Sequence, residues 1–390
     1  MSSTLSLEAH EWDAFSVPHC VRLVGEEQHL LDAGSISVAT TLRTRVRVEE
    51  TGDELSLRFG GGPRDQDGLW QAGEEAAAEF AAPWTKAMRD LLVADASDLD
   101  GLDIEVDFGP LWRVCPPAVL TASPAVSVAL VVAATAHRGE GRRLTQMELA
   151  EAACRLHQAA TDPGHASVDR FYSDVLVSLV GGAGYVEPGG ERMNVQQILP
   201  PESLLLVLAP GIEESRAAHQ RDEGVRRARL RAQEAGGDVA QPGDVGLSAL
   251  FALAGSVLKE EEVTVLYGLM RVRQMTDGLL EYVGEPSVDN DRLAEICDEE
   301  SAVLTAYFGF PGSSYDRVRA AAHRAGALGA KLTWAFGAYP AAIVVAPGRR
   351  RDVGEALTNT FPGIYCLLAD MDPAGLLRAA DEEAAAGGEF

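Results

Sequence analysis

Asp174 is the position whose residue type and surroundings are best suited to chemistry. It follows Tyr172 at the start of an apolar run with the length and composition of a helix. An ionised carboxylate is stabilised at a helix N-terminus, where it can also accept a proton from a hydroxyl group. An aspartate that only complements the helix dipole has the same sequence signature. Both interpretations of Asp174 stay open at this stage.

Ser123 and Pro124 are a second candidate pair because they precede a strongly apolar segment. Serine is a preferred N-cap residue and proline is favoured in the first helical turn, so the pair predicts a helix over residues 123–136. The positive end of that helix can attract an anion. The alternative is that Ser123 only caps a helix of the core.

Arg22 is the third candidate, and it lies two residues after Cys20 in a segment rich in β-formers. Side chains two residues apart in a strand point to the same face of the sheet. Arg22 is therefore expected to share a face with position 20. It serves there either as a functional cation or as an arginine in an ion pair or on the surface.

Several common catalytic signatures are absent from the sequence. It contains no GxSxG, HExxH or Walker A motif, and no GxGxxG followed by an acidic residue at the spacing of dinucleotide-binding folds. The five cysteines lie far apart and form no CxxC pair, so the sequence predicts neither a zinc site nor a disulfide framework.

The charge of the chain restricts its partners. The 390 residues include 33 Lys and Arg against 59 Asp and Glu, which gives a net charge of −26. Such a surface repels phosphodiester backbones and anionic lipid, so nucleic acid is not an expected partner. The longest apolar run, residues 126–136, is shorter than a membrane span, and the first 15 residues lack a signal-peptide pattern. We expect a cytoplasmic protein without membrane contact.

The elements that position these candidates alternate between strand and helix without a strict βαβ repeat. Strands are predicted at residues 17–24 and 35–40, and residues 43–50 and 54–59 predict a hairpin across the turn at 51–53. Helices are predicted at residues 72–93, 123–136, 145–160, 214–235, 245–258, 263–283 and 315–325, and further strands at 103–108, 203–209, 331–335 and 342–345.

The length of the chain predicts two lobes, because a domain usually has about 100 to 200 residues. Residues 187–194 are rich in glycine and charge, as expected of a connection between lobes. We place the boundary there, which gives lobes at residues 1–195 and 196–390.

Four separated segments, taken in order, resemble the signature regions of the galactokinase branch of the GHMP small-molecule kinases. Residues 18–26 (PHCVRLVGE) resemble the family's PGRVNLIGEH motif, and residues 120–129 (LTASPAVSVA) resemble its phosphate loop GLSSSAALEVA. Residues 172–181 (YSDVLVSLVG) are similar to GIMDQFISLMG, and residues 326–333 (GALGAKLT) to the start of GALGARMTGAGFGGC. Four matches in the family's order are difficult to obtain by chance.

This resemblance implies an α/β fold of the two-lobed GHMP kinase type, an α+β arrangement with an N-terminal ribosomal S5-like lobe and a C-terminal ferredoxin-like lobe. The four segments are then expected to converge on one cleft. The resemblance also implies a reaction, the phosphorylation by ATP and Mg²⁺ of a hydroxyl group on a small polar molecule, a sugar or a related polyol.

The resemblance further assigns catalytic and phosphate-binding roles to individual positions. Asp174 matches the family's catalytic aspartate, which orients or deprotonates the attacking hydroxyl group. Cys20 stands where the family has its catalytic arginine, and Arg22 would supply the missing charge. Thr121 and Ser123 match phosphate-binding positions, and Ser123 is also the implied magnesium ligand.

Three further positions are the implied substrate contacts. Glu26 matches the family's glutamate, and His29 stands where the family has its sugar-binding aspartate. Tyr172 lies beside Asp174 and is expected to share its pocket. The change at position 29 indicates a hydroxyl-binding pattern different from that of the family.

The chain departs from the family in both loops that touch the nucleotide. Residues 116–123 (PPAVLTAS) contain two prolines and no glycine, which removes backbone donors and the space for a phosphate group. Residues 334–340 (WAFGAYP) keep only Gly337 of the family's glycine cluster, and their aromatic rings either narrow the cavity or pack in the core. Two hypotheses therefore stay open. The chain is a sugar-type kinase, or it keeps the fold, has lost phosphoryl transfer, and binds or converts a small polar ligand.

Overall fold

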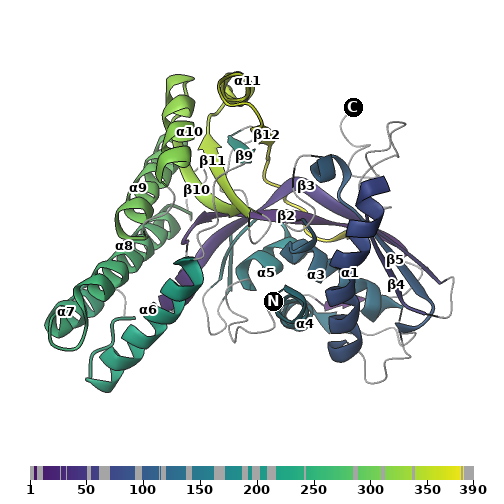
Figure 1. Ribbon diagram of the computed structural model, residues 1–390, viewed down its shortest axis with the longest axis horizontal. Coiled ribbons are helices and arrows are strands. Elements are labelled where there is room, and N and C mark those ends of the chain that lie inside the picture. The colour runs from purple at the N-terminus through teal and green to yellow at the C-terminus, as the bar shows by residue number, and fades with distance from the viewer. Residues whose placement is uncertain are drawn as a thin grey trace.

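A large mixed β-sheet with helices packed against it forms the framework of the protein (Figure 1). Its strand order is β12-β9-β11-β10-β2-β3-β5-β4, with β7 and β13 added at its side. The computed structural model describes residues 4–6, 12–26, 28–31, 33–50, 54–60, 71–92, 99–113, 115, 120–137, 143–161, 172–186, 192–195, 203–208, 217–240, 243–283, 289–308, 312–335, 339–378 and 381.

Two long antiparallel strands, β2 (Ala14–Val24) and β3 (Ser35–Glu50), lie at the centre of the sheet. Nearly every residue of β2 is buried, as its continuous apolar sequence predicts for a strand covered on both faces. The first six residues of β3 are also buried, whereas its last residues alternate between buried and exposed. The segments predicted as strands at 35–40 and 43–50 are therefore parts of one strand.

The predicted hairpin between residues 43–50 and 54–59 is wrong. β4 (Ser56–Gly60) pairs in parallel with β5 (Leu102–Asp107), and β5 lies between β4 and β3. The helix α1 (Gln71–Leu91) provides the crossover that parallel pairing requires. Every second residue of β5 is a buried aliphatic, so pairing β3 with β5 buries more apolar surface than the predicted hairpin with residues 54–59. The turn signal at 51–53 therefore does not decide the pairing.

The N-terminal helices pack on one face of this sheet (Figure 1). α3 (Pro124–Ala136) is buried along its whole length, and both α3 and α5 (Tyr172–Val180) pack directly against β2. α4 (Gln146–Thr161) packs against these two helices. α5 ends at a glycine turn, where Gly181 and Gly182 both have positive φ. The small strands nearby are β1 (Thr4–Ser6), β6 (Arg143–Thr145), β7 (Ala183–Val186) and β8 (Arg192–Val195).

The C-terminal half extends the same sheet. β10 (Gly329–Ala335) joins β2 through the pair Ala335 and Val21, and it continues into β11 (Tyr339–Val345). β9 (Leu204–Leu208) and the edge strand β12 (Tyr365–Leu368) complete it. The helices of this half are α6 (Ala217–Glu234), α7 (Gly243–Leu253), α8 (Glu260–Val283), α9 (Asn290–Phe308), α10 (Gly312–Arg324) and α11 (Arg350–Thr360), of which α9 and α11 were not predicted.

None of the helices in the described ranges is both long and apolar enough to cross a bilayer.

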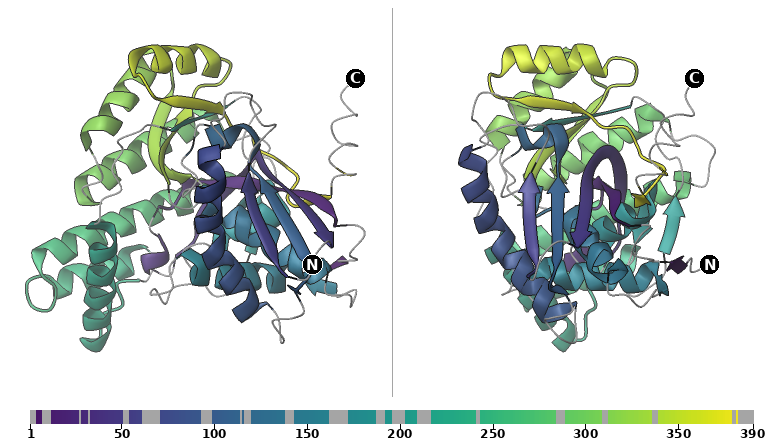
Figure 2. Two further views of the ribbon diagram at one scale, coloured as in Figure 1. Left: turned by 45° about the vertical axis from the view of Figure 1, so that its right-hand side comes forward. Right: turned by 90° about the vertical axis from the view of Figure 1, so that its right-hand side faces the viewer.

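The last described residues return to the N-terminal strands (Figure 2). Met371 bridges to Thr40, Arg43 pairs with Asp372, and β13 (Leu377–Arg378) pairs with β2. The division into lobes at residue 195 stays a prediction, and these C-terminal residues lie on strands of the predicted N-terminal lobe.

Substitution of Gly181 tests the attachment of this returning segment. Gly181 has φ +79°, and a Cβ atom there would lie 2.4 Å from the backbone of Ala374 and of Gly375. Gly236 has a similar φ of +83° but open space around its Cβ position. We expect Gly236→Ala to reduce the free energy of unfolding by about 1 kcal/mol and Gly181→Ala by at least about 3 kcal/mol, measured by chemical denaturation. Equal reductions would mean that the segment is not held against Gly181.

Candidate active site

Arg22 and Cys20 both face α5, as the alternation of side chains in a strand predicted. The Arg22 Nη2 atom donates to the Asp174 Oδ2 atom at 2.9 Å. The Cys20 thiol lies 3.3 Å from the carbonyl oxygen of Asp174 and 3.1 Å from the Ser178 hydroxyl. The register of β2 shifts just before Cys20 and just after Arg22, so the two residues lie in one regular stretch between two irregularities.

Asp174 lies in the first turn of α5, and its carboxylate has two buried partners. One oxygen binds Arg22, and the other accepts a hydrogen bond of 2.6 Å from the Ser37 hydroxyl. Ser37 is opposite Arg22 in the β2–β3 register, which explains why both reach the same carboxylate. Sequence reasoning missed Ser37. The alternation Ser35, Ile36, Ser37 in an apolar strand was the available signal, and Ser35 binds the Ser173 hydroxyl at 3.0 Å.

Glu26 lies in the turn after β2 and faces protein groups on every side. Its Oε1 atom is 2.9 Å from the Thr333 hydroxyl and 3.5 Å from Lys331 Nζ, and its Oε2 atom is 3.9 Å from Arg22 Nη1. The Thr333 hydroxyl also lies 2.7 Å from the carbonyl oxygen of Arg22. One hydroxyl proton cannot serve both acceptors, so a proton on Glu26 would complete the bonding.

The surroundings of Glu26 favour that proton. Burial raises the pKa of Glu26 from 4.5 to about 7, against the opposing attraction of Lys331 and Arg22, and the nearby charge of Glu300 raises it further. Because Glu26 is 1% exposed, water does not screen these interactions. Its carboxyl group is thus poised to change charge near neutral pH.

Lys331 and Glu300 complete this cluster from the C-terminal half. Lys331 Nζ donates to Glu300 Oε2 at 2.7 Å, and Glu300 Oε1 accepts from the backbone N–H groups of Gly25 and Glu26, each at 3.0 Å. Sequence reasoning missed both side chains. Lys331 had a signal, a charge within an apolar strand, whereas Glu300 lies in an acidic helical stretch that has the appearance of a solvated surface.

Ser123 is the N-cap of α3, as predicted, and its hydroxyl is engaged by buried groups. Its Oγ atom accepts from the Ala125 N–H and lies 2.9 Å from His19 Nδ1, while His19 Nε2 lies 2.7 Å from the Thr44 hydroxyl. Burial, helped by the charge of Arg43, lowers the pKa of His19 to about 3, so the imidazole is neutral. The family motif PGRVNLIGEH has glycine at the position of His19.

This arrangement does not fit Ser123 as a magnesium ligand. The residue is 1% exposed, and its hydroxyl already has two partners. Mg²⁺ requires open oxygen ligands in octahedral geometry. Within the described part of the chain, no group of three His, Cys, Asp or Glu side chains could hold a metal ion.

The remaining predicted site residues are less closely connected. Thr121 is buried in the turn before α3. Tyr172 is half-buried at the start of α5, and its hydroxyl donates to Met147 Sδ at 3.4 Å. Both prolines at 116 and 117 lie outside the described residues, as do the side chains of His29 and of the aromatic segment 334–340.

The four predicted segments meet on β2 and the turn that follows it. Ser123 contacts His19, Asp174 contacts Arg22, and Thr333 contacts both Arg22 and Glu26. The described side chains of the four segments therefore lie in contact with one another, although these residues are up to 311 positions apart. That the segments line one cleft stays a prediction.

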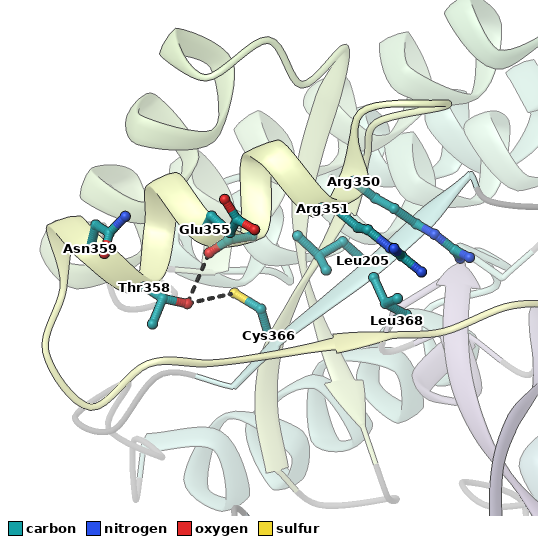
Figure 3. A pocket seen from close by; sticks show the side chains of 9 residues that line it. Leu205, Arg350, Arg351, Glu355, Thr358, Asn359, Cys366 and Leu368 are labelled. Carbon is teal, nitrogen blue, oxygen red and sulfur yellow. Dashed lines mark hydrogen bonds between the residues drawn. The ribbon is translucent and has the colours of Figure 1, made fainter.

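A pocket of about 480 Å³ lies elsewhere, between α11 and β12 (Figure 3). Arg350 lines it but forms an ion pair with Asp370, and the exposed Arg351 and Glu355 carry opposite charges. The Thr358 hydroxyl donates to a backbone carbonyl of its own helix. The pocket thus presents charges of both signs, and no predicted site residue lines it.

The pKa of Glu26 predicts how stability depends on pH. Because its folded pKa lies above the ordinary value, Glu26 stabilises the protein most at low pH, and this contribution is lost as the pH rises through 7. Glu26→Gln mimics the protonated form. We expect its free energy of unfolding, relative to the wild type, to improve by about 1 to 2 kcal/mol between pH 5.5 and pH 8 in chemical denaturation. The exposed Glu49→Gln is the control, and a parallel pH profile in both variants would contradict the prediction.

Comparisons with known proteins bear on the fold. No protein-family model and no curated sequence matches the chain. Among solved structures, the galactokinase of Lactococcus lactis in complex with galactose has a TM-score of 0.70 at 13% identity, covering 94% of this chain and 95% of that one. The mevalonate kinase of Methanococcus jannaschii has 0.59 at 15% (92% and 98% covered), and the homoserine kinase of Cytophaga hutchinsonii has 0.50 at 16% (93% and 96%). The chain therefore has the GHMP kinase fold.

Proposed function

We propose that the chain is a small-molecule kinase that transfers the γ-phosphoryl group of ATP to a hydroxyl group of a sugar or related polyol. The observation that supports this proposal is the buried ion pair of Asp174 and Arg22 at 2.9 Å. It combines a carboxylate that can accept a proton with a cation that can neutralise phosphoryl charge, and phosphoryl transfer needs both.

Asp174 is the proposed base. An ionised carboxylate has about four acceptor positions, and Arg22 and Ser37 use one on each oxygen, so the carboxylate can still accept a substrate hydroxyl. The hydroxyl oxygen attacks the γ-phosphorus, the bond from that phosphorus to the bridging oxygen breaks, and ADP leaves. The hydroxyl proton passes to Asp174.

Arg22 is the proposed charge clamp. Its guanidinium group is fixed by Asp174 on one side and faces Glu26 on the other, so it is preorganised before a substrate binds. Preorganised charge stabilises the transferred phosphoryl group without further rearrangement. Tyr172 and His29 stay proposed substrate contacts.

A second candidate function is the binding of a small polar ligand without phosphoryl transfer. It is favoured by the neutral His19, whose Nδ1 atom lies against the Ser123 hydroxyl. This hydroxyl is the N-cap of α3, and a phosphate group bound there would need it. The absence of glycine from residues 116–123 favours the same candidate.

Asp174→Asn separates chemistry from packing. The amide keeps the shape of the side chain and removes its charge and basicity, so ATP-dependent phosphorylation should fall by at least about 10²-fold. The assay is ADP formation with galactose, mevalonate, homoserine and a panel of other sugars and polyols. The control is Asp372→Asn, which removes a carboxylate that is paired with Arg43 and not with Arg22. Full activity of a folded Asp174→Asn variant would exclude the proposed base.

ATP affinity separates the two candidates. A glycine-rich loop offers backbone N–H groups to the phosphates, and each such charge-assisted hydrogen bond is worth about 1.5 to 3 kcal/mol. Because residues 116–123 have no glycine, we expect a dissociation constant near the millimolar range, measured by calorimetry with and without Mg²⁺. Weak binding accompanied by turnover supports the kinase. Absence of both ATP binding and turnover, with retained affinity for a polar ligand, supports the second candidate.

A further inference from the structure

Five buried charged side chains form a chain of alternating sign from the N-terminal helices to the C-terminal half. In spatial order they are Asp174, Arg22, Glu26, Lys331 and Glu300, and none of these side chains is more than 8% exposed. They come from α5, β2, the turn after β2, β10 and α9. Such a series is stable only when each charge has a partner, so its members depend on one another.

Arg22 is the member on which two carboxylates compete. Its Nη2 atom is 2.9 Å from Asp174 Oδ2, and its Nη1 atom is 3.9 Å from Glu26 Oε2. At short range in a buried environment, each of these carboxylates attracts the guanidinium group strongly. In the observed geometry Arg22 lies closer to Asp174 than to Glu26. Glu26 has a second cation, Lys331, on its other side.

Lys331 contacts Glu26 from that other side. Its ammonium group is fully buried, 3.5 Å from Glu26 Oε1 and 2.7 Å from Glu300 Oε2. Burial lowers the pKa of Lys331, but the charges of Glu300 and Glu26 outweigh that effect and raise it above its ordinary value, so the lysine stays charged. Glu300, the partner of Lys331, is itself held in place because it also accepts hydrogen bonds from the backbone N–H groups of Gly25 and Glu26.

We propose that Lys331, anchored by Glu300, is a positioning residue that compensates the charge of Glu26 and thereby keeps Arg22 directed at Asp174. The proposal rests on the proposed function in one respect, that Arg22 and Asp174 act together in the reaction. Lys331 itself does not touch the reacting atoms.

Removal of the lysine charge should redirect Arg22. In Lys331→Met, Glu26 loses its nearest cation. Loss of that charge raises the pKa of Glu26 further, so the variants are compared at about pH 9, where the ionised Glu26 carboxylate draws the guanidinium group away from Asp174. In the double variant Lys331→Met/Glu26→Gln, the competing carboxylate is also removed, so Arg22 should return to Asp174. Lys331→Arg, which keeps the charge, should resemble the wild type. The exposed Lys259→Met is the matched control for loss of a lysine.

The orientation of Arg22 can be measured without turnover, by NMR of protein labelled with ¹⁵N-arginine. The Arg22 side-chain resonance is assigned by its loss in Arg22→Lys. We expect it to move in Lys331→Met, to return in the double variant, and to stay in place in Lys331→Arg and Lys259→Met. An unmoved resonance in folded Lys331→Met overturns the proposal. Lys331→Gln, which retains a hydrogen-bond donor, replaces Lys331→Met if that variant does not fold, with the same expected and contrary results.

A kinetic measurement then separates this proposal from the proposed function. If the kinase proposal is correct, kcat of Lys331→Met falls at least about 10-fold with a smaller change in KM, and Lys331→Arg keeps most of the wild-type kcat. An unchanged kcat in Lys331→Met, in an active wild type, overturns the positioning role. If the wild type shows no phosphoryl transfer while the Arg22 resonance responds as expected, the proposed function fails and the control of Arg22 by Lys331 stands.

Discussion

The ion pair between Arg22 and Asp174 is the interaction on which the centre of this structure depends. Burial of a single charge is costly, and the cost is offset only when the charge is paired and its remaining polar atoms are bonded. Each of these two side chains therefore requires further partners, and these are recruited from distant elements. The Ser37 hydroxyl in β3 donates a hydrogen bond to Asp174, and Glu26, in the turn after β2, forms an ion pair with Arg22.

This requirement also explains how the two halves of the chain are connected. Three carboxylates and two cations leave one excess negative charge in the buried series, which a proton on Glu26 neutralises. The raised pKa of Glu26 reflects that excess as well as its burial. Because Lys331 and Glu300 belong to the C-terminal half, electrostatic balance of the site needs both halves in place, in addition to the continuous sheet through β10 and β2.

Much of the fold and part of the site could be predicted from the sequence. Ser123 at the N-cap and the shared face of Cys20 and Arg22 depend on local rules, and both are confirmed. The pairing of β3 with β5 depends on a strand some 50 residues away along the chain, which no turn signal contains. Glu300 could not be predicted for the same reason, because only the packing of α9 against β10 buries its side chain and brings it to Lys331.

The two ends of the site, at Asp174 and at the N-terminus of α3, bear on phosphoryl transfer in opposite directions. At Asp174 the charges are retained in a geometry suited to proton transfer and charge neutralisation. At α3, a neutral imidazole and a hydroxyl replace the open N-terminus that an anion would use. The His19 contact consists of hydrogen bonds between uncharged groups, which are weaker than charge-assisted bonds to a phosphate. A triphosphate could therefore displace Ser123 from His19 only if it offsets the loss of this buried contact at His19 Nδ1.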